Sequence, residues 1–316
     1  MNSKSWPYKP NTVQIEAVQG CNRHCSFCGT AGIDQTIKKA DVKTIFHTCK
    51  LIKDAGLNCR ILLAGHGEPT LHPEIVNIVR TIRKTLPKNM IHMFTNGTVI
   101  EKKPELVDEL FAAGLNDLVF DEYSDHRVGR FVRNDPVCQK YRVVQQGKGT
   151  PLFANKSPKE KRICIVPPID GADNTLSRSL NTHCGAGMEP PKMPYQTKCS
   201  IIFRDFFVRY DGNIAICCND FRGEYFVTNI LACKSFEEAY FHKRLESARR
   251  FLMQNDRGAI HPCDVCTARA IRPGLLPDAR GQLTLKTPTE EDRKTVINTR
   301  PSLALIVRRE WERSER

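Results

Sequence analysis

The segment "TVQIEAVQGCNRHCSFCGT" (residues 12–30) joins a short run of β-branched residues to a loop that contains three cysteines. The run TVQIEAV (12–18) predicts a strand. Cys21, Cys25 and Cys28 follow this strand at C-x3-C-x2-C spacing. Three thiolates at this spacing can hold three corners of a cuboidal iron–sulfur cluster.

Two other kinds of site are open for this loop. A structural zinc site needs four ligands, and no fourth cysteine follows closely. His24 lies between two of the cysteines, where the loop would have to reverse before the imidazole could join them on zinc. A redox pair made by Cys25 and Cys28 would leave Cys21 without a role. We therefore favour the cluster.

The composition indicates a globular protein with reduced thiols. The chain has 316 residues, of which 40% are hydrophobic, which is enough for one large core or two domains. No apolar run resembles a signal peptide or a membrane span, so we expect a cytoplasmic protein with no membrane contact. Fourteen cysteines in that compartment favour metal binding over disulfides. The net charge of +13 favours an anionic partner, although a basic solubilising surface would also explain it.

Beyond the cysteine loop, strand-like and helix-like segments alternate, which predicts parallel βαβ units and therefore an α/β sheet or barrel. We assign this core to residues 10–166. The predicted helices are 41–55, 73–86, 104–114 and 134–146, and the further predicted strands are 59–65, 90–94, 117–121 and 162–166.

The alternation ends at Pro167. Asp211-Gly212 between two apolar runs predicts a hairpin, and Ser235 with Glu238 forms the capping box of a predicted helix. We therefore predict a second, small α+β domain made of a hairpin and a helix. This domain spans residues 199–271 and contains the hairpin (201–218) and the helix (235–252). A connecting segment (167–198) precedes it, and a basic, partly disordered peripheral tail (272–316) follows it.

Three motifs at the ends of successive predicted strands resemble the radical S-adenosylmethionine (SAM) superfamily. The cysteine loop has an aromatic residue, Phe27, before its last cysteine. "GHGEP" (65–69) resembles the family's glycine-rich loop for the methionine amino group, with His66 where glycine is usual, and "TNG" (95–97) follows the third strand. The resemblance covers residues 10–166 and implies a partial (β/α)6 TIM-like barrel.

In that family three thiolates hold a [4Fe–4S] cluster, and the amino and carboxylate groups of SAM bind the fourth iron. One electron from a flavodoxin- or ferredoxin-type donor then cleaves SAM to methionine and a 5′-deoxyadenosyl radical, which abstracts a hydrogen atom. Asp121 and Glu122 follow the fourth strand and are candidates for the ribose hydroxyls, or are solvated acids at a strand end. The resemblance implies cluster ligands Cys21, Cys25 and Cys28, and SAM contacts at Gly65, His66, Gly67, Glu68, Pro69, Thr95, Asn96, Gly97, Asp121 and Glu122.

A second cysteine set follows the pattern C-x12-G-x4-C and, after a long gap, C-x2-C. A four-cysteine zinc site is one interpretation. The pattern also resembles the twitch domain, the short form of the SPASM domain of radical SAM enzymes, in which four cysteines ligate one auxiliary [4Fe–4S] cluster. No cysteine occurs in the following "TARAIRPG", so we expect one auxiliary cluster, which accepts an electron from a substrate radical or shapes the pocket. The four predicted ligands are Cys199, Cys217, Cys263 and Cys266.

We expect most of the remaining cysteines to be small core residues. Cys218 is the exception, because strand alternation points it away from its neighbour Cys217. It could donate a hydrogen atom to a product radical, as thiols do in radical SAM epimerases. The others are Cys49, Cys59, Cys138, Cys164, Cys184 and Cys233.

Residues 127–162 contain ten Lys and Arg against Asp135 and Glu160, with aromatic residues between them. Cations and aromatics together suit phosphates and bases, and a solvated helix and loop is the alternative. The segment 148–162 precedes the fifth predicted strand, so it should lie on the edge opposite the site. The candidates on the active-site edge are Arg127, Arg130 and Arg133.

Four functions remain open at this stage. The first is modification or isomerisation of a nucleic-acid- or nucleotide-linked group, such as an amino-acid adduct on thymidine in phage DNA. The second is oxidation or epimerisation of a small molecule, as in aminoglycoside-type dehydrogenases. The third is peptide maturation, which is disfavoured because only about a dozen residues precede the first strand. A zinc-stabilised nucleic-acid-binding module would explain the charge but not "GHGEP" or the three-cysteine loop.

Overall fold

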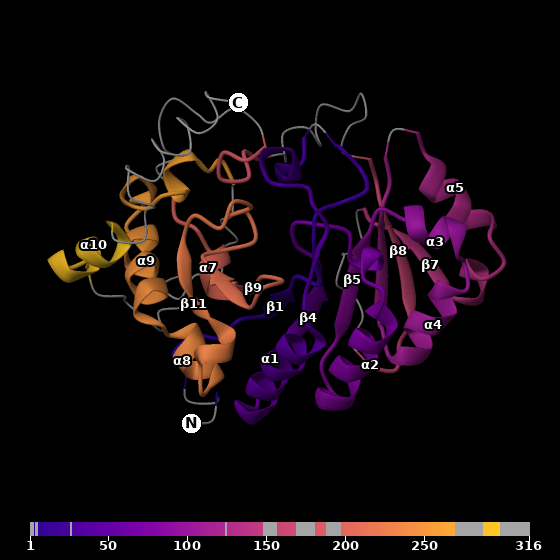
Figure 1. Cartoon of the computed structure of the whole chain (residues 1–316), viewed down its shortest axis with the longest axis horizontal. Helices are drawn as coiled ribbons and strands as arrows, with labels where there is room; N and C mark the ends of the chain where they lie inside the picture. The colour runs from indigo at the N-terminus through magenta and orange to yellow at the C-terminus, as the bar shows by residue number, and fades with distance from the viewer. Residues whose placement is uncertain are drawn as a thin grey trace.

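The computed structural model describes residues 3, 6–25, 27–123, 125–147, 157–168, 181–187, 197–268 and 287–297. Nine strands form one sheet (Figure 1), in which neighbours pair in parallel except for β10, which is antiparallel to both of its neighbours. The order is β11 (Phe226–Asn229), β10 (Asn213–Ala215), β9 (Asp205–Val208), β1 (Thr12–Ile15), β4 (Arg60–Leu63), β5 (Ile91–Thr95), β6 (Asp117–Asp121), β8 (Arg162–Val166) and β7 (Arg142–Gln145). A separate pair, β2 (Val18–Gln19) and β3 (Lys38–Lys39), flanks the cysteine loop.

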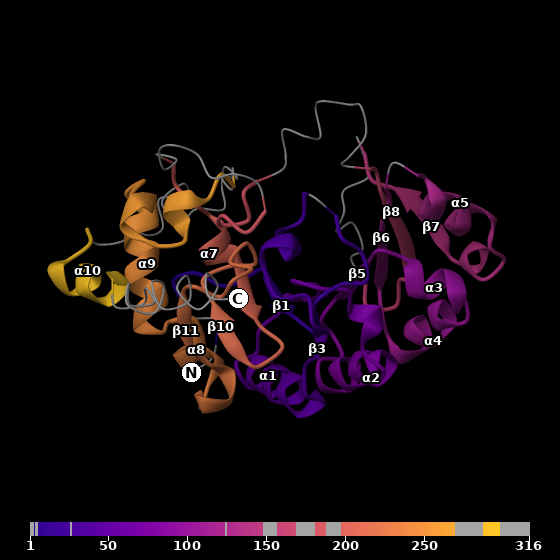
Figure 2. The ribbon, with the colours of Figure 1, turned by 45° about the horizontal axis from the view of Figure 1, so that its top comes forward.

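The sheet curves, and helices cover its outer side (Figure 2). These helices are α1 (Val42–Asp54), α2 (Ile75–Thr85) and α4 (Leu106–Ala113). The central strands carry buried β-branched residues such as Val13 and Ile61, which pair in register, as is typical of parallel strands covered on both faces. The strands and helices predicted between residues 41 and 121 are confirmed to within a few residues, and the architecture is a partial TIM-like barrel.

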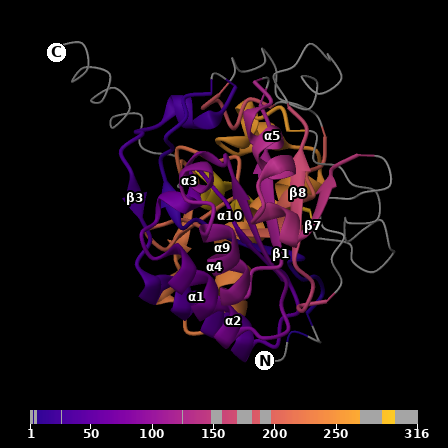
Figure 3. The same ribbon diagram turned by 90° about the vertical axis from the view of Figure 1, so that its right-hand side faces the viewer.

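The predicted helix 134–146 is wrong. Helix α5 (Arg127–Asn134) ends where that helix should begin, and a short 3-10 turn, η4 (Cys138–Lys140), leads into edge strand β7. Asp135 is extended, with φ −75° and ψ 128°, because Pro136 excludes the helical conformation from the residue before it. Figure 3 shows α5 and β7 together at this edge of the molecule.

Two other helical segments differ from expectation. The predicted helix 235–252 divides into α8 (Phe236–Tyr240) and α9 (Lys243–Met253), because His242 leaves the helical conformation and its side chain caps α9. The predicted cap of the first part is confirmed: Oγ of Ser235 accepts a hydrogen bond from the Glu238 amide at 3.1 Å. Residues at the start of the predicted hairpin instead form the short helix α7 (Ile201–Arg204).

The hairpin predicted in a separate domain continues the barrel sheet. Its first strand, β9, pairs in parallel with β1, and the turn at Asp211-Gly212 leads to β10. Gly212 has φ +81°, which favours glycine at this turn. Within the predicted tail, α10 (Glu290–Ile297) contacts α9 through a 2.7 Å hydrogen bond from Ser247 to Asp292, and residues 272–286 and 298–316 lie outside the described residues.

Helix α3 (Thr98–Lys102) completes the helices of the barrel half. Among the helices of the described residues, none is both long and apolar enough to cross a membrane.

Candidate functional site

The carboxyl ends of β1, β4, β5 and β6 meet at the upper edge of the sheet in Figure 1. In parallel sheets and barrels this edge is where ligands bind. The loops that follow these strands enclose a pocket of about 260 Å³. It is lined by Cys21, Arg23, Cys25, Phe27, Cys28, Thr30, Ala64, Gly65, Gly67, Glu68, Phe94, Thr95, Asn96, Asp121 and Tyr123.

The cysteine loop and the GHGEP loop are joined through their backbones. The amide of Gly20 donates to the carbonyl of His66 at 2.9 Å, and the amide of Glu68 donates to the carbonyl of Gly20 at 3.1 Å. A Cβ at Gly67 would lie 2.4 Å from the carbonyl oxygens of Val18 and Gly20. Only glycine therefore allows the two loops to approach this closely.

Glu68 connects the GHGEP loop to the TNG loop. Its Oε1 accepts a hydrogen bond from the Thr95 hydroxyl at 2.8 Å, and its Oε2 accepts one from the Asn96 amide at 2.7 Å. Nδ2 of Asn96 in turn donates to Sγ of Cys21 at 3.4 Å and to Oδ1 of Asn22 at 2.8 Å. Burial raises the pKa of Glu68 although these hydrogen bonds oppose the shift. The three motifs thus form one hydrogen-bonded unit.

The thiols of the first site fit a group that takes three thiolates. Burial raises the pKa of Cys21 and of Cys25, so both thiols are protonated when no metal is bound. A bound metal would deprotonate these thiols. The pocket contains Cys28 as its third cysteine and no fourth. Among the described residues, no three His, Cys, Asp or Glu side chains are grouped so that they could hold one metal ion.

Asp121 and Tyr123 form the side of the pocket at the end of β6. Burial, with the nearby charge of Glu68, raises the pKa of Asp121 to about 7. The guanidinium carbon of Arg23 lies 3.7 Å from the centroid of the Tyr123 ring. Sequence reasoning missed Arg23 and Tyr123, although their positions inside the cysteine loop and just past a strand end were signals for them.

Four of the predicted SAM contacts lie outside the pocket lining, so their roles stay predictions. The ring of His66 is buried between Phe207 and Phe221, with centroid separations of 4.9 and 4.1 Å. Gly97 is the left-handed N-cap of α3. Glu122 faces α5, with Oε1 3.7 Å from a guanidinium nitrogen of Arg133.

Pro69 also lies outside the pocket lining. It is the first residue of the 3-10 turn η3 (Pro69–Leu71), where its missing amide proton leaves no donor unsatisfied.

The predicted auxiliary ligands lie near one another. Burial raises the pKa of Cys263, and the charges of Cys217, Cys266 and Cys199 add to the shift, so the other three thiols lie close enough to Cys263 to act on its charge. Cys199 precedes α7, Cys217 follows β10, and Cys263 and Cys266 flank a 3-10 turn.

A fifth cysteine joins this group. Cys184, which we expected to be a core residue, is buried and packs against Cys266. Cys218 does not line the pocket, and its hydrogen-atom-donor role stays a prediction. The other remaining cysteines are buried as expected: Cys49, Cys59, Cys138, Cys164 and Cys233.

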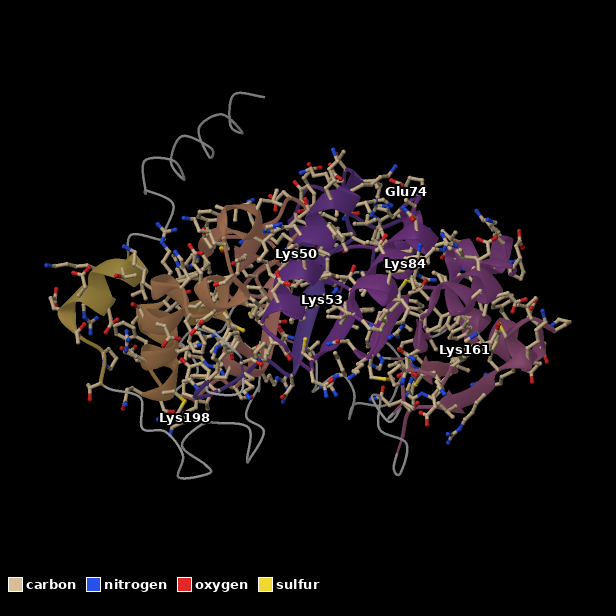
Figure 4. The ribbon with its side chains drawn as sticks, turned by 90° about the horizontal axis from the view of Figure 1, so that it is seen from below. Lys50, Lys53, Glu74, Lys84, Lys161 and Lys198 are labelled. Carbon is tan, nitrogen blue, oxygen red and sulfur yellow. The ribbon has the colours of Figure 1, made fainter. Side chains whose placement is uncertain are left out.

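The basic segment 127–162 is distributed over different parts of the molecule. Arg127, Arg130 and Arg133 are exposed on α5, which follows the pocket residue Tyr123 in the chain. Arg162 is instead buried, with two 2.8 Å hydrogen bonds to the Asp117 carboxylate. Figure 4 shows Lys161 in the view from below, which is the edge where the strands begin. Residues 148–156 lie outside the described residues.

Comparisons with known proteins agree with this geometry. Residues 15–124 match the model of the Radical SAM superfamily. The chain is 30% identical over 149 residues to a probable GTP 3′,8-cyclase of Thermoplasma volcanium, covering 46% of this chain and 44% of that protein. It is 28% identical over 147 residues to the GTP 3′,8-cyclase of Chlorobaculum tepidum, covering 46% and 43%. The chain therefore spans less than half the length of these curated relatives.

Two solved structures share the fold. BtrN in complex with AdoMet and 2-DOIA superposes with a TM-score of 0.64 at 17% identity, covering 83% of this chain and 95% of that chain. SuiB of Streptococcus suis bound to the precursor peptide SuiA gives a TM-score of 0.52 at 13% identity, covering 90% and 76%. The family match and the pocket that joins the three motifs lead to one conclusion: the chain contains a radical SAM domain, which spans residues 15–124.

Proposed function

We propose that this chain is a radical SAM enzyme whose first cysteine loop holds a [4Fe–4S] cluster and whose pocket binds SAM. One observation carries the proposal: Cys21, Cys25 and Cys28 share a pocket with the GHGEP and TNG loops, and no fourth cysteine lines it. When bound, the cluster and SAM supply one-electron cleavage to a 5′-deoxyadenosyl radical, with the electron coming from a flavodoxin- or ferredoxin-type donor.

The chain's own residues position these groups. The backbone of Gly65 and Gly67 lines the pocket where the methionine end of SAM would lie, and Glu68 fixes the neighbouring TNG loop. Asn96 orients the thiol of Cys21. Asp121 lies across the pocket and offers an acceptor for the ribose hydroxyls. Fixed polar groups of this kind orient a cofactor and exclude water from a reactive intermediate.

We further propose one auxiliary [4Fe–4S] cluster in the second cysteine group. The support is the proximity of Cys199, Cys217 and Cys266 to Cys263, whose pKa their charges raise, because these four residues could provide the four thiolates that a closed cluster takes. The segments 10–166 and 199–271 would then serve as the core and the auxiliary-cluster region of one continuous sheet.

We propose a nucleotide or a nucleic-acid-linked group as the substrate class. Arg127, Arg130 and Arg133 lie exposed on α5, which begins just after the pocket residues Asp121 and Tyr123. Arg127 is paired with Glu101 at 3.0 Å, whereas Arg130 has no ion pair within the residues that the structure describes. The relatives whose printed name is GTP 3′,8-cyclase support a nucleotide, and a small-molecule substrate is the alternative that the BtrN complex suggests.

The cleavage of SAM tests the first part of this proposal. Anaerobically reconstituted protein, with dithionite and SAM, should yield 5′-deoxyadenosine, and Cys25→Ala should abolish the product because it removes one of the three thiolates. Cys138→Ala replaces a buried cysteine outside the pocket lining, and as the matched control it should retain the product. Product formation by Cys25→Ala would overturn the assignment of the site.

Retention of DNA and of nucleoside triphosphates at low salt tests the substrate class. Replacing Arg127, Arg130 and Arg133 with Gln should weaken binding, and the loss should shrink as salt rises because fewer counterions are released. Replacement of Lys50, Lys53 and Lys84 with Gln is the charge-matched control, because these lysines are exposed on α1 and α2 and none of them lines the pocket (Figure 4). Equal loss in both variants, or no binding at low salt, would contradict a nucleotide-linked substrate.

A further inference from the structure

The turn formed by residues 181–187 is fixed to the C-x2-C segment of the second cysteine group. The hydroxyl of Thr182 donates to the carbonyl of Val265 at 2.6 Å. The amide of Thr182 donates to the hydroxyl of Thr267 at 3.0 Å. These two bonds hold the turn on both sides of Cys266.

The opposite side of the same turn contacts the first cysteine loop. A Cβ at Gly32 would lie 2.1 Å from the carbonyl oxygen of Ala186, so the two backbones pass without room for a side chain. The ring of His183 makes an edge contact with Phe221 at 4.8 Å, and a Cβ at Gly29 would lie 2.7 Å from Phe221. The turn thus lies between the two cysteine sites.

The backbone of this turn is held in the left-handed region. His183, Cys184 and Gly185 have φ values of +46°, +54° and +82°. Two successive non-glycine residues in this region cost on the order of 1–3 kcal/mol each, and such conformations persist only where surrounding contacts impose them. The amide of Gly185 donates to the carbonyl of Thr182 at 2.8 Å and closes the turn. This conformation directs the Cys184 side chain toward the second cysteine group.

Cys184 contacts one of the proposed ligands. It is buried and packs against Cys266. A four-iron cluster takes four thiolates, and the four proposed ligands supply them, so Cys184 is left over. An S–H group is a donor, and ligand thiolates are acceptors.

We propose that Cys184 is a fifth thiol of the second cysteine site, which does not bind iron but donates its S–H hydrogen bond to Cys266 and raises the reduction potential of the cluster that Cys266 helps to hold. This inference rests on the proposed auxiliary cluster. Hydrogen bonds to the sulfurs are one of the factors that set the potential of such clusters, because they stabilise the more negative, reduced state. Cys184 is therefore a positioning residue.

Iron analysis and an EPR-monitored redox titration of the reconstituted full chain test this role. Cys184→Ala should keep about eight irons per chain, as expected for two four-iron clusters. At a fixed potential its ratio of reduced to oxidised auxiliary cluster should fall about tenfold, which is about 59 mV for a one-electron couple. Cys184→Ser keeps a donor and should lie between Cys184→Ala and the unmodified chain. Cys233→Ala, another buried cysteine, should leave the potential unchanged.

Two results would overturn the inference while leaving the auxiliary cluster in place. One is an unchanged potential in Cys184→Ala. The other is loss of about four irons in Cys184→Ala, as expected for Cys217→Ala, which would make Cys184 a ligand. A content of about four irons in the unmodified chain would instead refute the auxiliary cluster itself, and the inference with it.

Discussion

Replacement of His66 with glycine, the residue usual at this position of the GGEP-type loop, should destabilise the protein. The His66 side chain is fully buried and joins three elements. Its Nε2 lies 2.9 Å from the carbonyl oxygen of Cys218, and its Nδ1 lies 3.2 Å from Oε1 of Glu16. Its ring packs against Phe221 on one side. The side chain thus connects the GHGEP loop to the residue beside the proposed ligand Cys217.

The size of the loss follows from these contacts. Removing a buried ring costs about 3–5 kcal/mol through lost burial and the cavity left behind. The carbonyl of Cys218 would lose its partner, which costs about 1–3 kcal/mol when the acceptor stays buried. His66 and Arg209 also hold the pKa of Glu16 below its usual value although burial opposes them, so Glu16 would lose part of that stabilisation. Because such contributions overlap, we expect a total of about 4 kcal/mol.

Thermal unfolding of the reconstituted protein measures this loss. For a chain of this size, about 4 kcal/mol corresponds to a decrease in Tm of about 6 °C. His66→Gln, which keeps a hydrogen-bonding side chain of similar length, should lose less than half as much. A decrease of less than about 2 °C for His66→Gly, corresponding to about 1 kcal/mol, would refute the claim that this side chain holds the two regions together.

Three more substitutions test separate contacts. Gly67→Ala should abolish formation of 5′-deoxyadenosine, because its Cβ would force the GHGEP loop away from the cysteine loop; an active variant would contradict the need for this close approach. Asp117→Asn should cost about 3–5 kcal/mol in urea unfolding, because it leaves the buried Arg162 charge without its carboxylate. His92 and Arg162 hold the pKa of Asp117 below its usual value, although burial opposes them. The unmodified chain should therefore lose the stability that the ionised Asp117 contributes as pH falls below about 4, and the variant should show no such loss. Asp121→Asn should raise Tm more at pH 8 than at pH 5.5. The reason is that the pKa of Asp121 is raised to about 7, so ionisation of this carboxyl destabilises the folded ligand-free protein as pH rises. An equal increase in Tm at both pH values would contradict the raised pKa.

The sequence predicts the barrel well where local chemistry determines the structure. Short apolar runs such as 117–121 favour buried strands, and the three motifs follow strand ends whose parallel pairing brings them to one edge. The strand β7 was missed because its apolar spacing also fits a helix, although the effect of Pro136 on Asp135 was readable.

Features that depend on contacts between distant segments were not predictable in the same way. Cys184 lies 82 positions before Cys266, and only a left-handed turn held by Thr182 brings the two together. The departure at His66 was visible in the sequence, but its burial against Phe221 depends on how the hairpin joins the barrel sheet. Local pattern contains no information about such packing.

The central claim is that the first cysteine loop holds a cluster with one iron left open for SAM. EPR spectroscopy of the reduced Cys263→Ala variant tests it most directly, because this variant should lack the auxiliary cluster and retain about four irons. Addition of SAM should change the EPR spectrum of the remaining cluster, because the cofactor would bind the iron that no thiolate occupies. A spectrum unaffected by saturating SAM, or zinc in place of iron at this site, would contradict the account.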